Sequence, residues 1–144
     1  MISLAKTEYG LRAIVKGCLN LSDAGEFYNL ANKLLMEIPR GFYVLVDIRE
    51  MHPIPVETVT ALKNIQQLFL AHGLRRAAII TTSNRVTVQL KKVSLETGLF
   101  DKEIYLNSGK YPDWEKRAIK WFKLGIDPEN NTRIRPRVYD YSPA

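Results

Sequence analysis

The chain has 144 residues, a net charge of +6 and a hydrophobic content of 46%, which suits one domain with a real core and argues against disorder. No apolar stretch approaches the roughly 20 residues that span a bilayer. Cys18 is the single cysteine, so an intrachain disulfide is excluded. We therefore expect a cytoplasmic globular protein without a membrane span.

The first third of the chain predicts a hairpin followed by a helix. Residues 2–6 and 11–16 alternate between apolar and polar side chains on either side of turn residues, which is typical of a β-hairpin. Apolar residues then follow helical spacing over residues 27–38. Ser22 is the expected N-cap of this helix, and Pro39 helps to end it.

Residues 42–73 are the most informative segment. An apolar run over residues 42–47 ends at Asp47 and indicates a buried, parallel strand. A helix expected from near Pro55 to a left-handed cap at Gly73 supplies the crossover that a parallel strand needs. Ligands and partners of such sheets bind at the carboxyl ends of the strands, beside helix N-termini, so we expect the functional site here.

The remaining elements continue the alternation of strands and helices. They are expected as a strand at residues 76–81, a helix from the N-cap Ser83 to Gly98, a short strand at residues 103–106, and a last helix from Pro112 to Gly125. The order β-β-α-β-α-β-α-β-α predicts an α/β domain. Its single, mixed but mostly parallel five-stranded sheet would be flanked by four helices and would open with a β-hairpin.

The domain is expected to occupy residues 1–125, with a C-terminal tail at residues 126–144. Pro136 and Pro143 interrupt the tail, yet it carries several apolar side chains. A partly disordered terminus and a tail packed on its own domain or on a dimer partner both remain open, as does a homodimer.

The strand at residues 42–47, the helix after it, the strand at residues 76–81 and the closing Trp-Glu-Lys-Arg-Ala-Ile-Lys-Trp-Phe segment together resemble a STAS-like domain. This is the fold of anti-sigma-factor antagonists and of the cytoplasmic domain of sulphate transporters. The resemblance covers roughly residues 1–125, with Asp47 as the best single match, and it is nearest to an uncharacterised bacterial branch. It implies a regulatory domain that binds a protein partner.

The resemblance also implies where a phosphorylation switch would lie. In the antagonists an Asp-Ser-Ser-Gly-like segment opens the helix, and one of its serines is phosphorylated. Counting from Asp47, residues 55–58 fall at that segment, with Glu57 in place of the serine. Thr58 is the only hydroxyl nearby. Glu57 could imitate the phosphorylated form, or it could simply be an acid in a first helical turn, which is worth about 0.3–1 kcal/mol. Thr58 could itself accept phosphate.

Other candidate residues flank the same junction. Asp47 could cap the following loop or orient a ligand. Ser83, Asn84 and Arg85 open the next helix with free N–H groups and a cation, which could meet an acidic partner or a small anionic ligand. We expect no metal or cofactor site, because His52 and His72 stand far apart with no cysteine partner.

The positive charge is concentrated in residues 73–99, where five Arg and Lys residues face Glu96 alone, giving +4. A solvated basic face is the plainer explanation, and we do not expect nucleic acid as a partner. No nucleophile or acid–base motif can be assembled, so we do not expect an enzyme. The sequence therefore predicts a non-catalytic protein-interaction or regulatory domain. The alternative is a carrier or sensor of a small apolar ligand between sheet and helices.

Overall fold

The computed structural model describes residues 1–128, so the expected packing of the tail falls largely on residues 129–144, outside the described part. Five strands and four α-helices alternate along the described chain, with two short 3-10 turns, η1 and η2. Their bounds are β1 (Ile2–Lys6), β2 (Gly10–Gly17), α1 (Leu21–Leu35), β3 (Tyr43–Met51), η1 (Val56–Thr58), α2 (Val59–Ala71), β4 (Arg76–Thr81), α3 (Asn84–Thr97), η2 (Leu99–Lys102), β5 (Glu103–Asn107) and α4 (Trp114–Leu124).

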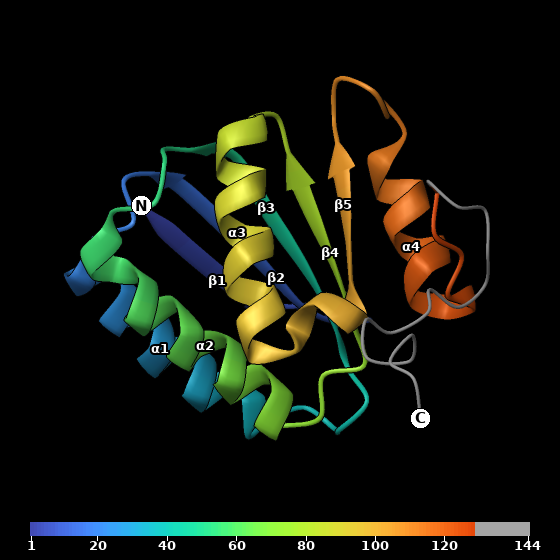
Figure 1. Cartoon of the computed structure of the whole chain (residues 1–144). Coiled ribbons are helices and arrows are strands. Elements are labelled where there is room, and N and C mark those ends of the chain that lie inside the picture. Colours follow the sequence, from blue (N-terminus) through green and yellow to red (C-terminus); the bar gives the residue numbers. More distant parts are fainter. Residues whose placement is uncertain (129–144) are drawn as a thin grey trace, which may run out of the picture.

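The strands form one sheet in the order β1-β2-β3-β4-β5. The β1–β2 hairpin is antiparallel and the other three pairs are parallel. Helices α1, α2 and α3 cover one face of the sheet, and α4 packs on the other (Figure 1). This confirms the predicted mixed, mostly parallel five-stranded sheet with four helices and an opening hairpin.

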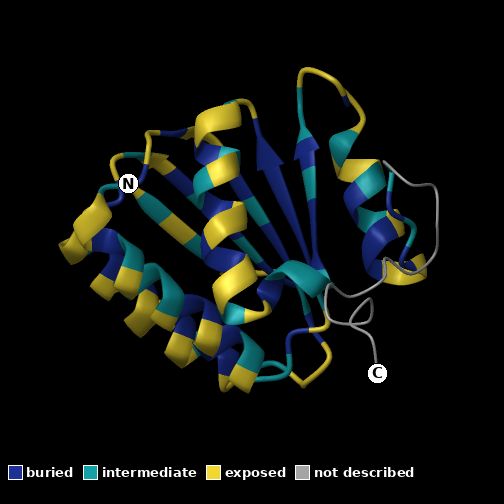
Figure 2. Ribbon diagram, viewed as in Figure 1, coloured by how far each residue is buried: buried dark blue, intermediate teal, exposed yellow. Residues whose placement is uncertain are grey.

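The core is divided by the sheet into two clusters. Along β4, Ala77 and Ile79 belong to the cluster beneath α1–α3, whereas Ala78 and Ile80 belong to the cluster beneath α4. Successive side chains of a strand point to opposite faces, so a strand covered on both sides is apolar at every position. Figure 2 shows β4 buried over nearly its whole length.

Gly10 lets β2 approach β3 closely. Its φ is +146°, and a Cβ at this position would lie 2.2 Å from the carbonyl oxygen of Tyr43. The next hydrogen bond along, from the Tyr43 N–H to the carbonyl oxygen of Tyr9, is 3.0 Å. A larger residue would therefore push apart the start of the β2–β3 pairing.

The boundaries of α1 differ from the prediction. Its N-cap is Asn20, whose Oδ1 accepts a hydrogen bond of 2.8 Å from the backbone N–H of Asp23. Ser22 instead lies exposed inside the first turn. Both residue types cap helices well, so the local pattern did not choose between them. The helix also ends at Leu35, before residue 38.

Strand β3 is longer than predicted. It continues past Asp47 to Met51, and the following helix begins with η1 before α2 proper starts at Val59. Asp47 therefore lies inside the strand and does not cap the following loop, which corrects that interpretation. Gly73, with a φ of +85°, follows α2 as expected.

Candidate interaction surface at the carboxyl ends of the strands

The carboxyl ends of β2, β3, β4 and β5 lie at one edge of the sheet, at the top of Figure 1. The segments that follow these strands therefore meet there. Residues 52–58 lead into α2, and residues 82–83 lead into α3. We call the exposed part of residues 52–58 and 82–88 the carboxyl-edge surface.

Two hydrogen bonds attach the β3–α2 connection to the loop before α1. The backbone N–H of His52 donates to the carbonyl oxygen of Gly17 at 2.9 Å. The Thr58 hydroxyl donates to the carbonyl oxygen of Leu19 at 2.9 Å, and the Thr58 side chain is fully buried. Phosphate on Thr58 would require this hydroxyl to leave Leu19 and η1 to open.

Gln89 of α3 holds the same connection from the other side. Its Oε1 accepts from the backbone N–H of Ile54 at 2.8 Å, and its Nε2 donates to the carbonyl oxygen of Ile54 at 3.1 Å. The side-chain amide thus satisfies both backbone groups of Ile54, much as a neighbouring strand would. This pair of bonds, the Gln89 clamp, fixes the backbone just before η1.

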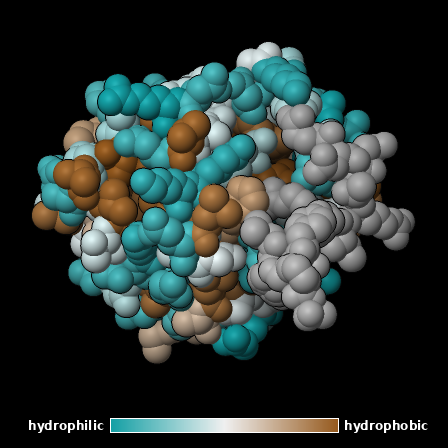
Figure 3. Space-filling model, viewed as in Figure 1, coloured by the Kyte–Doolittle hydropathy of each residue, from teal (hydrophilic) through white to brown (hydrophobic). Residues whose placement is uncertain are grey.

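The side chains of η1 that point outward are apolar and acidic. Val56 is 85% exposed, and Glu57 beside it is also exposed. On α3, Val88 is 66% exposed and neighbours Gln89, so the Gln89 clamp joins the two elements that carry these valines. Figure 3 shows hydrophobic atoms over α3 and toward the start of α2, set among hydrophilic ones.

The start of α3 contributes one capping residue and two exposed ones. Ser83 is the N-cap, and its hydroxyl oxygen accepts from the backbone N–H of Val86 at 3.3 Å. Asn84 and Arg85 are exposed. The structure therefore brings Glu57, Asn84 and Arg85 to one edge of the molecule, as the sequence rule for parallel strands predicts.

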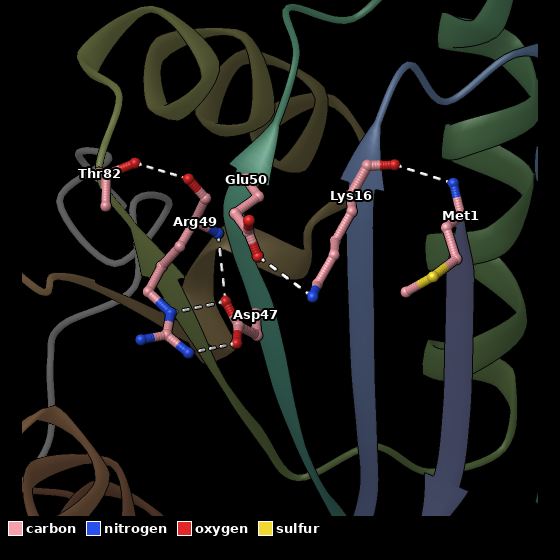
Figure 4. A network of polar contacts seen from close by, with 6 residues as sticks. All are labelled: Met1, Lys16, Asp47, Arg49, Glu50 and Thr82. Carbon is pink, nitrogen blue, oxygen red and sulfur yellow. Dashed lines mark hydrogen bonds and ion pairs between the residues drawn. The ribbon is translucent and has the colours of Figure 1, made fainter.

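Asp47 lies apart from this edge, in a polar network within the sheet. Its carboxylate accepts three hydrogen bonds from Arg49, at 3.2 Å from the backbone N–H, 3.0 Å from Nε and 2.8 Å from Nη2. The carbonyl oxygen of Arg49 accepts from the Thr82 hydroxyl at 2.7 Å. Figure 4 shows this network beside the exposed Lys16–Glu50 ion pair of 3.2 Å.

The electrostatics of Asp47 favour its charged form. Burial by itself raises the pKa of Asp47, but the hydrogen bonds from Arg49 and the positive charges of Arg49 and Arg12 outweigh that effect. The net result is a pKa below the usual value of an aspartate. The guanidinium of Arg49 also lies over the Trp114 ring at 4.9 Å. The geometry explains Asp47 as one partner of a buried, compensated pair.

A small apolar cavity lies between the sheet and helices α1–α3. Its volume is about 90 Å³, and its lining is almost entirely aliphatic and aromatic, with Gln66 and Glu103 as the polar contributors. The Gln66 amide donates to the Ser94 hydroxyl at 3.0 Å and accepts from the Thr97 hydroxyl at 2.6 Å. Its polar atoms are thus engaged within the protein.

Two kinds of site were sought in the part of the chain that the structure describes. Within residues 1–128, no three His, Cys, Asp or Glu side chains are grouped so that they could hold a metal ion. Over the same residues, no helix has both the length and the apolar character to cross a membrane.

This geometry is that of a STAS-like, SpoIIAA-like α/β fold, and solved structures agree. An uncharacterized protein of the DUF3478 family with a SpoIIAA-like fold, from Shewanella loihica PV-4, matches with a TM-score of 0.58 at 17% identity, over 85% of this chain and 92% of that one. The anti-sigma factor antagonist SpoIIAA in its unphosphorylated form matches with a TM-score of 0.51 at 12% identity, over 81% of this chain and 97% of that one. No protein-family model and no curated protein sequence matches the chain.

Proposed function

We propose that the chain is a non-catalytic protein-interaction and regulatory module that binds a protein partner through the carboxyl-edge surface. The observation that carries this proposal is the pair of exposed valines, Val56 at 85% and Val88 at 66%, on a backbone held by the Gln89 clamp. Apolar side chains that are already fixed lose little entropy on binding. Charged residues at their border, Glu57 and Arg85, match the polar rim of an ordinary interface.

The likeness in fold to the anti-sigma factor antagonist SpoIIAA supports a regulatory role. We further propose that Glu57 provides a permanent negative charge where phosphorylated relatives of this fold class would carry a regulated one. Its exposure in η1, ahead of α2, supports this. Replacing Glu57 with Gln removes the charge at nearly constant size, so the Glu57→Gln variant should bind the partner more weakly. Unchanged binding would reduce Glu57 to an ordinary first-turn acid.

The experiment uses three baits in affinity capture from a native extract. They are the wild-type chain, the double variant Val56→Asp/Val88→Asp, and the control Met36→Asp. Met36 is 77% exposed and follows α1, so its substitution adds the same charge away from the carboxyl-edge surface. The proposal predicts a partner that is retained by wild type and control and is lost with the double variant. Equal capture by all three baits would refute it.

The second candidate is a carrier or sensor of a small apolar ligand, and the core cavity favours it. The cavity of about 90 Å³ is smaller than the roughly 150 Å³ that holds benzene in an engineered core and than the roughly 300 Å³ of ordinary ligand sites. A ligand of ordinary size would therefore require α1–α3 to move outward. Native mass spectrometry of the purified chain tests this, since a stoichiometric apolar adduct would support the carrier and an unliganded mass would count against it.

A further inference from the structure

A groove runs between α1 and α2 on the outer side of the helical layer. The two helices lie side by side at the lower left of Figure 1 and pack against each other. The groove has a volume of about 570 Å³, and no charged residue lines it. The lining residues are Leu21, Ala24, Gly25, Tyr28, Asn29, Ala61, Asn64, Gln67, Leu68 and Ala71.

Gly25 is not explained by the fold. It lies inside α1, where glycine costs roughly 0.5–1 kcal/mol relative to alanine. A Cβ built at Gly25 would meet no atom within 4 Å, so nothing in the chain requires its absence. What the glycine does provide is a flat, open wall of the groove, and this permits close approach by a backbone from outside.

Apolar side chains on α1 flank this opening. Leu21 is 54% exposed and Tyr28 is 37% exposed. The spacing of seven residues places both on the same side of the helix as Gly25. An exposed tyrosine has a rigid apolar ring and a polar tip, which makes it a common anchor in interfaces.

The charge distribution identifies the occupant. The whole chain carries +6, so two copies repel each other unless they meet at an uncharged surface. A two-fold interface places the same patch on both sides, and like charges in it would face their own copies at a cost. The uncharged lining removes this penalty. Nucleic acid or an anionic membrane would instead require cations here.

We propose that a second copy of this chain occupies the α1–α2 groove, giving a two-fold symmetric dimer in which Tyr28 and Leu21 of each copy pack against the open wall at Gly25 of the other. The interface shares no residue with the carboxyl-edge surface. Each copy in the dimer can therefore still bind a partner, and the proposal does not depend on the proposed function.

The test is sedimentation velocity from micromolar to submillimolar concentration, with secondary structure checked by circular dichroism. The wild type should shift toward the dimer as its concentration rises. Gly25→Trp fills the groove and should remain monomeric. Leu95→Trp, a control on α3 where Leu95 is 52% exposed, should dimerise like the wild type.

A second variant keeps the test decisive if Gly25→Trp fails to fold. Gln67 is exposed on α2, and Gln67→Arg places like charges opposite each other in the dimer while retaining a good helix former. It should weaken dimerisation about tenfold or more. A wild type that stays monomeric throughout would overturn the proposal and leave the groove to a different occupant. A dimer insensitive to both groove variants would overturn it equally.

Discussion

The buried hydrogen bond from Thr58 to the carbonyl oxygen of Leu19 should be a main support of the β3–α2 connection. Replacing Thr58 with Val keeps the branched shape but removes the donor. The Leu19 carbonyl then loses its 2.9 Å partner in a buried place, and an unpaired buried group of this kind costs about 1–3 kcal/mol. We expect Thr58→Val to lower the free energy of unfolding by that amount.

Thr82→Val is the matched control. The Thr82 hydroxyl donates to the Arg49 carbonyl at 2.7 Å, but in an exposed position, where water can replace it. A surface change of this kind should stay within about 0.5 kcal/mol. Urea unfolding followed by circular dichroism measures both variants under the same conditions. Equal stabilities of Thr58→Val and the wild type would show that water reaches Leu19 and that the junction is not the packed unit described above.

Three further outcomes are expected. Asp47 has a pKa lowered in the folded state, so the stability it contributes is present above its unfolded pKa of about 3.9 and is lost as the pH falls through the lower, folded value; the urea midpoints of Asp47→Asn and wild type should therefore differ at neutral pH and converge in acid, and a constant difference would argue against the pairing with Arg49. Gly25→Ala should stabilise the dilute protein by about 0.5–1 kcal/mol in thermal unfolding, whereas a loss of stability would reveal a packing role. Gln89→Ala should speed amide hydrogen exchange at Ile54, and exchange at the wild-type rate would remove the Gln89 clamp from the account.

Much of the fold follows from the sequence because burial dictates its pattern. A strand covered on both faces must be apolar throughout, and the Ala-Ala-Ile-Ile run of β4 identifies itself in this way. The end of β3 was missed because a charged residue ordinarily ends such a run. Asp47 and Arg49 evade that rule, since residues two apart share one face of a strand and these two neutralise each other there.

The candidate site was predicted in outline and missed in detail. The gathering of Glu57 and Arg85 at one edge follows from the topology of parallel strands. The inward turn of Thr58 does not, because no local pattern distinguishes a threonine bonded to a distant carbonyl from an exposed one. The Gln89 clamp joins positions 35 residues apart in sequence, and the exposed Val56 reads as an ordinary apolar residue until its surroundings are known.

The central claim is that recognition occurs on the carboxyl-edge surface, and a hydrogen-exchange footprint tests it most directly. Amide exchange would be compared between the free chain and the complex recovered with wild-type bait. The account predicts new protection over residues 52–58 and 82–88, with the outer side of α1 and α2 unchanged. Protection confined to α4 or to the α1–α2 groove, with residues 52–58 exchanging as in the free chain, would contradict it.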